Sequence, residues 1–328
     1  MAQTKLVIIH KVRRVEYMRK NTRSGVAYNT KFSSIYILYL FLIPAIGLTF
    51  FFNYIPMFSN VIAFMDYDFT EGWMGMGSPF VGFKHFAFLQ ESWFYELAIR
   101  TITYSFFILI TSFPLALIFA LLINELKSSK FKKITQTVSY IPHFVSWVTV
   151  SGLVYIFLTV DPSGLLNNLK VLIFGGERIS YMQDSGYFLP LLILTQIWKE
   201  TGWGCIIYLA ALTTIDPSLY EAAVVDGATR WQKVWYITLP ALIPTTAILL
   251  IFSLVGLFSS NFDQIFNLQN SVIRQTTDTI NIYTFYVGVR SQQYSLAAAV
   301  GLFQGVVTFI LVMISNYTSK KMSGSGII

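Results

Sequence analysis

Two neighbouring charged residues, Lys199 and Glu200, interrupt the long apolar stretch 188–213 near its middle. If that stretch crosses a bilayer as a helix, the pair lies roughly 17 Å from one end, where ionisable groups are costly and usually face water or a partner. Trp198 and Trp203 flank the pair, and indole rings stack well on the apolar faces of sugar rings. We therefore predict a solute path lined by these four residues. A structural ion pair at an interface with a second membrane subunit explains the charges equally well.

A second group of polar residues follows the apolar stretch 236–260. Asn261 and Asp263 could contact a solute at the end of that stretch, or could solvate a helix end, and the second explanation is favoured. Successive residues of a helix point about 100° apart. Lys199 and Glu200 therefore cannot both face one narrow channel.

Motifs for catalysis or nucleotide binding are absent from the sequence. It contains no Gly-x-x-x-x-Gly-Lys-Ser/Thr loop for phosphates, no Gly-x-Ser-x-Gly nucleophile elbow and no His-Glu-x-x-His zinc site. The three histidines are far apart, without the spacing of metal ligands. We therefore expect no catalytic residue, metal or cofactor on this chain. A membrane-embedded glycosyl-transferring enzyme is the weaker alternative, because only Lys199 and Glu200 are ionisable well inside the apolar stretches.

The overall composition is that of a protein embedded in lipid. Hydrophobic residues make up 55% of the 328 and charged residues only 12%, against about 25% in a soluble domain. The net charge of +7 does not indicate a nucleic-acid partner, because the basic residues flank apolar runs and form no stripe. Six apolar stretches are long enough to cross a hydrocarbon core of about 30 Å as helices. They are 34–56, 98–123, 134–160, 188–213, 236–260 and 293–317.

The distribution of Lys and Arg sets the expected orientation. Of the 23 basic residues, 16 lie before the first stretch, in alternate connections and in the C-terminal tail, whereas 6 lie in the remaining connections. Both termini are therefore expected in the cytoplasm, as an even number of spans requires. The resulting division is a cytoplasmic tail (1–33), a first transmembrane helix (34–56), an outer loop (57–97), a five-helix core (98–317) and a second cytoplasmic tail (318–328).

The connection 216–240 carries the most specific pattern. Asp216 can cap a helix that has Pro217 at its first position. Gly227 permits a turn that a Cβ would oppose. A second short helix is then expected over 228–237, before the next span. The pattern predicts two short helices on the cytoplasmic face, able to dock into a cleft of another protein.

This connection resembles the EAA loop of binding-protein-dependent ABC importer permeases. The resemblance rests on Glu221-Ala222-Ala223, Asp226-Gly227-Ala228 and Leu239-Pro240. It implies an all-α, six-helix membrane protein with the type I (MetI-like) permease fold. It also implies that this loop couples the chain to a separate ATPase subunit. The implied coupling residues are Glu221, Ala222, Ala223, Asp226, Gly227 and Arg230.

Further segments are similar to the type I permeases that import oligosaccharides and polysaccharide fragments. They are Tyr54-Ile-Pro-Met57, Val81-Gly-Phe-Lys84, the segment 140–147 and Tyr208-Leu-Ala-Ala-Leu212. General likeness within this branch points to the first permease subunit of an alginate importer, although no residue specifies alginate. A monosaccharide importer is the alternative.

The resemblance also implies a location and a set of partners. The location is the bacterial cytoplasmic (inner) membrane. The partners are a second homologous permease in a heterodimer, two ATPase subunits that bind ATP and Mg²⁺, and an extracytoplasmic solute-binding protein. The predicted outer loops hold 10 of the 16 acidic residues and could receive the binding protein, or could simply be solvated. A passive channel is a further alternative function, and it would need neither ATP nor a docking loop.

Overall fold

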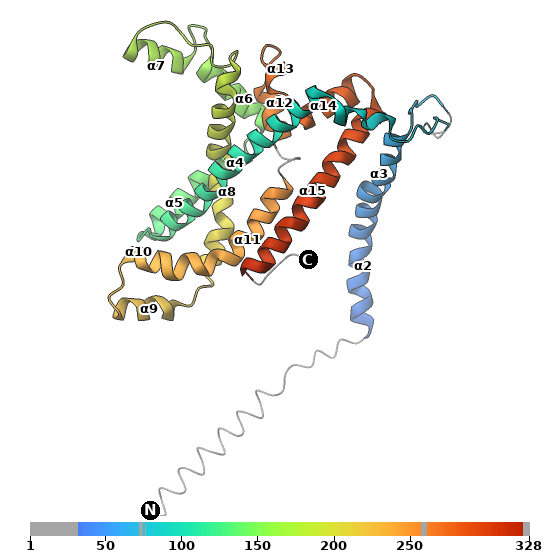
Figure 1. The fold of residues 1–328 in the computed structure, drawn as a ribbon. Coiled ribbons are helices and arrows are strands. Elements are labelled where there is room, and N and C mark those ends of the chain that lie inside the picture. Colours follow the sequence, from blue (N-terminus) through green and yellow to red (C-terminus); the bar gives the residue numbers. More distant parts are fainter. Residues whose placement is uncertain (1–31, 72–74, 76, 257–260, 324–328) are drawn as a thin grey trace, which may run out of the picture. The chain divides into compact units, whose positions relative to one another are not determined.

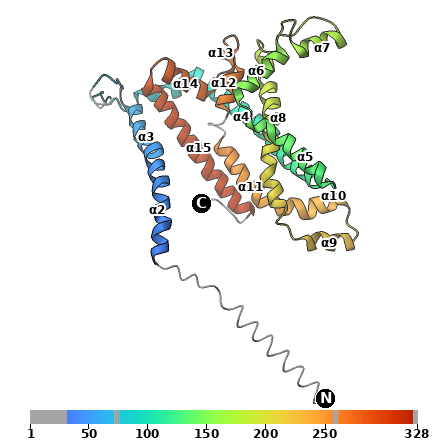
Figure 2. The ribbon, with the colours of Figure 1, turned by 180° about the vertical axis from the view of Figure 1, so that it is seen from behind.

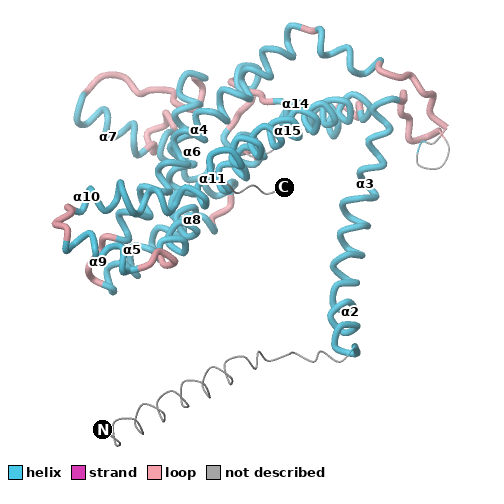
Figure 3. The backbone as a smooth tube through the Cα atoms, turned by 60° about the horizontal axis from the view of Figure 1, so that its bottom comes forward, coloured by secondary structure: helices cyan, strands magenta, loops and turns pink. Residues whose placement is uncertain are grey.

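The computed structural model describes residues 32–71, 75, 77–256 and 261–323. Within these residues the regular structure is helical, apart from an isolated antiparallel bridge between Met65 and Phe80 (Figure 3). The predicted all-α class is therefore confirmed for the described part of the chain. Most of the predicted tail over 1–33 and the last five residues lie outside it.

The chain divides into two units at Ser59. The described part of the first unit, from Phe32 on, is one continuous apolar helical run, which agrees with the predicted first span over 34–56. It comprises α2 (Phe32–Thr49), the π-helical η1 (Phe50–Tyr54) and α3 (Ile55–Phe58). The second unit holds the remaining elements and is described by itself below.

Two pairs of long helices run through the second unit. α4 (Ser92–Asn124) packs along α8 (Phe188–Leu212), and α11 (Leu239–Val255) packs along α15 (Tyr294–Ser323). Both pairs can be followed in the two opposite views of Figures 1 and 2. Each helix is apolar over most of its length, which fits helices that bury some residues against one another and expose the rest to lipid.

Small residues bring α8 close to its neighbours. Ala120 of α4 packs in one buried cluster with Cys205 and Tyr208 of α8. One turn away on α8, a Cβ built at Gly202 would overlap the backbone carbonyl of Ser139. Close backbone approach of this kind is typical of helix contacts in membranes.

The predicted span over 134–160 is a broken helix in the structure. The segment instead comprises α5 (Ser129–Tyr140), the 3₁₀ turn η5 (Ile141–Phe144) and α6 (Trp147–Leu158). Its two halves are bent by 98°. Pro142 cannot donate a backbone hydrogen bond, and Ser146 caps a new helix by accepting from the amide of Thr149 at 3.2 Å. The chain therefore starts a second helix in a new direction.

The connections that were predicted as outer loops are largely helical. α4 already begins at Ser92, inside the predicted loop 57–97. The short helices in these connections are η2 (Ser59–Phe64), η4 (Lys84–Gln90), α7 (Leu165–Phe174), η6 (Ser185–Tyr187), α12 (Phe262–Leu268), α13 (Arg274–Thr277), α14 (Ile280–Phe285) and the π-helical η8 (Tyr286–Arg290). Long-range contacts hold them: Gln264 is fully buried and donates to the carbonyl of Leu192 at 2.7 Å and to the hydroxyl of Thr195 at 2.9 Å.

The described helices include four that are long and apolar enough to span a membrane, with the bent α5–α6 pair as a fifth. The four are Tyr39–Phe64, Ser92–Asn124, Arg230–Leu254 and Tyr294–Tyr317. α8 has 25 residues but is not among them, since residues such as Lys199 and Glu200 lower its hydropathy. The count of six spans and the cytoplasmic side of both termini stay predictions.

Candidate functional site

The predicted docking loop forms a well-defined arm, which we define as residues 216–238. It begins with α9 (Pro217–Val225), where the Oδ1 atom of Asp216 accepts a hydrogen bond from the amide of Ser218 at 2.9 Å. That hydrogen bond holds the pKa of Asp216 below its usual range. The predicted cap at Asp216 is therefore confirmed.

The turn of the arm depends on one glycine. Gly227 has a φ of +75°, in the left-handed region that L side chains rarely adopt, as its sequence position predicts. A capping box then starts α10 (Arg230–Lys233). The hydroxyl of Thr229 accepts from the amide of Gln232 at 3.3 Å, and the Gln232 side chain accepts from the amide of Thr229 at 2.7 Å. The Thr-x-x-Gln spacing is a sequence signal for this box that the sequence analysis did not use.

The second half of the arm is not a separate short helix, contrary to the prediction for 228–237. α10 continues through the π-helical η7 (Val234–Thr238) directly into α11, so that Arg230–Leu254 forms one candidate span. The hydroxyl of Thr238 donates to the carbonyl of Lys233 at 3.3 Å and shares a 2.9 Å hydrogen bond with the hydroxyl of Tyr220. The hydrogen bond between Tyr220 and Thr238 therefore ties α9 to the end of the arm that continues into α11.

The residues predicted to couple to an ATPase lie at the surface of this arm. Ala223 is half-buried, whereas the others are exposed: Glu221, Ala222, Asp226, Gly227 and Arg230. Val224 and Val225, between them, also expose their apolar side chains. Such a surface can dock against another protein.

A cavity of about 490 Å³ lies between α4, α8 and α11. Its wall is mostly apolar, with a few polar side chains, as in many sites for small organic ligands. The Oγ atom of Ser112 is buried and makes no hydrogen bond within the described residues. The wall residues that bear on function are Ser112, Phe113, Gln196, Glu200, Trp203, Tyr208, Phe252 and Asn261.

The structure separates the two charged residues of α8. Glu200 lines the cavity, whereas the side chain of Lys199 is only 7% exposed and donates to the backbone carbonyl of His143. The Nδ1 atom of His143 lies 2.8 Å from the Glu200 carboxylate, which is also 3.4 Å from the Lys199 ammonium. The His143 ring stacks on Trp203 with centroids 4.2 Å apart. We call these four residues the α8 clamp, because they fix the break between α5 and α6 to the middle of α8.

Of the other four residues predicted to line the solute path, two line the cavity and two do not. Trp203 and Asn261 line the cavity. Trp198 is half-exposed and lies outside its wall, and Asp263 is in the first turn of α12, also outside it. His143 is the residue that sequence reasoning missed, because it was set aside as a scattered histidine and its partners lie 56 and 57 residues away.

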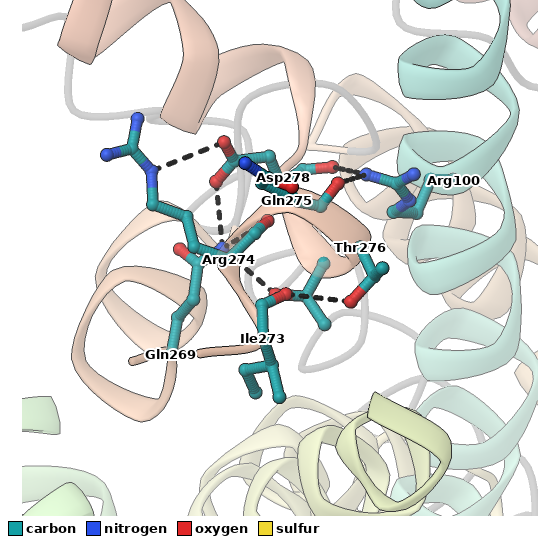
Figure 4. A network of polar contacts seen from close by, with 8 residues as sticks. Arg100, Gln269, Ile273, Arg274, Gln275, Thr276 and Asp278 are labelled. Atoms are coloured by element: carbon teal, nitrogen blue, oxygen red, sulfur yellow. Dashed lines mark hydrogen bonds and ion pairs between the residues drawn. The ribbon is translucent and has the colours of Figure 1, made fainter. Parts of the chain in front are cut away.

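A polar network joins α13 to α4 at the other end of the second unit from the arm (Figures 1 and 4). Arg100 of α4 donates to the backbone carbonyls of Gln275 and Asp278, at 3.2 Å each. The Asp278 carboxylate accepts from Gln269 at 2.8 Å and lies 3.4 Å from Arg274. Burial raises the pKa of Asp278 above its usual range, although both contacts oppose that shift. The network holds a predicted outer loop in a defined shape.

Known proteins resemble this chain over both the arm and the cavity. Residues 94–324 match the family described as the binding-protein-dependent transport system inner membrane component. The chain is 42% identical over 292 residues to the polygalacturonan/rhamnogalacturonan transport system permease protein YteP of Bacillus subtilis (strain 168), covering 88% of this chain and 89% of that protein. It is 40% identical over 291 residues to Protein LplB of the same organism, covering 88% and 90%.

Solved structures with the same fold are also known. One is a bacterial ABC transporter involved in the import of the acidic polysaccharide alginate. A chain of it matches with a TM-score of 0.80 and 36% identity, covering 90% of this chain and 98% of that one. A second is a bacterial alginate ABC transporter in complex with an alginate pentasaccharide-bound periplasmic protein. It matches with a TM-score of 0.81 and 35% identity, covering 91% and 99%.

Proposed function

This chain belongs to the binding-protein-dependent transport system inner membrane component family, and on that premise we propose that it moves an acidic oligosaccharide inward. Membership confirms the predicted family, the type I permease fold and the location in the bacterial inner membrane. The chain is a transport permease. The solute, the energy source and the assembly are the proposed parts.

The arm is the observation that carries the proposal. Its exposed surface offers a separate ATPase subunit a place to dock, and its second half is continuous with α11. Leu249, Phe252 and Ser253 of α11 line the cavity. A displacement of the arm by closing ATPase subunits would therefore reach the cavity wall through one helix. This arrangement supports alternating access, in which the cavity opens first outward and then inward.

The proposed solute class follows from the relatives and from the cavity. One relative is named for polygalacturonan and rhamnogalacturonan, and the solved structures for alginate, described as an acidic polysaccharide. Among the described residues that line the cavity, Glu200 is the one with a carboxylate, and it lies beside His143 and Lys199. The Lys199 ammonium offsets the negative charge of Glu200 and so lowers its repulsion of a carboxylated sugar. Gln196 and Asn261 offer hydrogen bonds to sugar hydroxyls.

Partner subunits would complete the pore, hydrolyse ATP and deliver the solute. We expect a second, homologous permease, because a closed pore takes more walls than the three helices that bound the cavity here. Two ATPase subunits would bind ATP and Mg²⁺ on the cytoplasmic side, where the arm would lie with both termini. An extracytoplasmic binding protein would deliver the solute to the opposite end, where the Arg100 network fixes the surface.

Uptake by the reconstituted transporter tests the proposal. The full complex in liposomes, with ATP inside and binding protein outside, should accumulate short oligogalacturonates or alginate oligosaccharides. It should take up maltopentaose, a neutral control of similar size, at least about tenfold more slowly. Equal uptake of the neutral sugar would refute the solute class. Uptake that persists without ATP would refute the importer itself and favour a passive channel.

A further inference from the structure

A second, smaller pocket lies between the end of α4 and the arm. It encloses about 310 Å³, and three basic side chains line it: Lys127, Arg230 and Lys233. One carboxylate, that of Glu125, also lines it, which leaves a net charge of about +2 at neutral pH. None of the three cations takes part in an ion pair within the described part of the chain. The pocket therefore presents unneutralised positive charge in a concave site.

The pocket lies where two candidate spans end. One span finishes at Asn124, which lines the pocket, and the other begins at Arg230. Large aromatic side chains project from the same segment: Trp231, Trp235 and Tyr236 are 74%, 63% and 79% exposed. Exposed Trp and Tyr at the ends of spans are typical of the boundary between hydrocarbon and head groups. The pocket therefore lies at the ends of two candidate spans, where the phosphates of a bilayer would be.

These observations favour one ligand chemistry. Basic pockets between transmembrane helices bind anionic lipid head groups. A phosphate group accepts several charge-assisted hydrogen bonds from Lys and Arg, which are about twice as strong as neutral ones. The pocket shares no lining residue with the larger cavity, so it is not part of the solute path. We propose that this pocket binds the phosphate of an anionic phospholipid through Lys127, Arg230 and Lys233.

The position of the pocket gives such a lipid a structural role. Tyr220 of α9 and Thr238 of η7 both line it and share a hydrogen bond. A bound head group would therefore contact α4 and both halves of the arm. It would hold the arm at a fixed angle to the end of α4.

Lipid binding to the purified transporter, containing the full chain, tests the inference. The delipidated complex is titrated with phosphatidylglycerol or with zwitterionic phosphatidylcholine, and bound lipid is counted by native mass spectrometry. The double variant Lys127→Ala/Lys233→Ala should bind phosphatidylglycerol roughly tenfold more weakly, since each basic residue near an anionic lipid contributes several-fold. The matched control is Lys130→Ala/Lys132→Ala, which removes the same charge from α5 outside the pocket and should bind like the wild type.

Four results would overturn the inference. The two lipids could bind equally, or the control pair could lose as much affinity as the pocket pair. Inorganic phosphate at the lipid's concentration could displace phosphatidylglycerol, which would make the ligand a soluble anion. The pocket variant could instead lose its ATPase subunits while lipid affinity stays unchanged, which would assign the charges to that protein. If the wild-type protein took up a neutral sugar as fast as an acidic one, only the proposed solute class would be refuted. The proposed lipid site would be unaffected.

Discussion

The arm and the α8 clamp carry their functional groups in opposite ways. In the arm, the hydrogen bonds that set the geometry join residues close in sequence: Asp216 with Ser218, Thr229 with Gln232. In the clamp, the partners of Lys199 and Glu200 lie 56 and 57 residues away, at the break of another helix. The arm is encoded locally, and the clamp exists only once the helices have packed.

This difference predicts how substitutions in each region should affect folding and transport. A change in the arm should alter coupling and leave the fold intact. A change at the clamp or its supports should disturb the packing of α8 first, and transport as a consequence. Four substitutions, in order of decreasing effect, test that distinction.

Gly202→Val should have the largest effect. A Cβ there overlaps the backbone of Ser139, which cannot move as a flexible side chain can. Overpacking of this kind costs about 3 kcal/mol, so we expect little monodisperse protein and a sharply lowered Tm. Gly152→Val is the control, because a Cβ at Gly152 meets nothing within 4 Å. A folded, active Gly202→Val protein would mean that α5 and α8 are not this close.

Gly227→Val should stop transport without unfolding the protein. The left-handed φ of +75° costs a branched side chain roughly 1–2 kcal/mol, which the turn can avoid by changing shape. Uptake and co-purification of the ATPase should fall at least about tenfold, with yield and Tm close to wild type. Gly227→Asn should retain most activity, because Asn tolerates this conformation. If Gly227→Val transports normally, the arm is not the coupling element.

His143→Ala should have an intermediate effect on stability. It leaves the Glu200 carboxylate without its 2.8 Å partner, at a cost of about 1–3 kcal/mol. Glu200→Gln should cost less, because the amide keeps the shape and can still accept a hydrogen bond. In a double-mutant cycle the two changes should couple by at least about 0.5 kcal/mol in the free energy of unfolding. Additive effects would show that the pair is not an energetic unit.

Asp216→Ala should have the smallest effect, confined to α9. Loss of a helix cap costs about 1 kcal/mol, visible as faster amide exchange in Ser218 and its neighbours with no change in α8. Asp216→Asn should retain the cap. Because the folded pKa of Asp216 is lowered, the stabilisation by its carboxylate is present above its ordinary pKa of 3.8. It is lost as the pH falls through the lowered value. Faster amide exchange in α8 would contradict the conclusion that residues close in sequence set the geometry of the arm.

Because contacts between residues close in sequence set the geometry of the arm, the sequence predicted the arm well. The cap at Asp216, Pro217 at the first helical position and the turn at Gly227 are all local rules, and all three are confirmed. The end of the arm was predicted less well. A separate short helix was expected over 228–237, whereas the π-helical turn at Val234–Thr238 carries α10 into α11 without a break.

The clamp could be predicted only in part. Lys199 and Glu200 stood out as charges in an apolar stretch, and the roughly 100° between their directions followed from helix geometry. The role of His143 did not, because it requires the 98° bend of the α5–α6 segment and its packing on α8. Pro142 was visible in the sequence, but a proline bends a membrane helix by an amount that its neighbours decide.

The unbroken helix from Arg230 to Leu254 has a mechanical consequence. Its 25 residues rise about 37 Å along the helix path, from the arm to Phe252 and Ser253 in the cavity wall. The path is not a straight rod, because Pro244 lies inside α11 and the helix changes direction between α10 and the end of α11 in Figure 1. The stiffness of the helix around Pro244 therefore decides how much of a movement of the arm reaches the cavity wall.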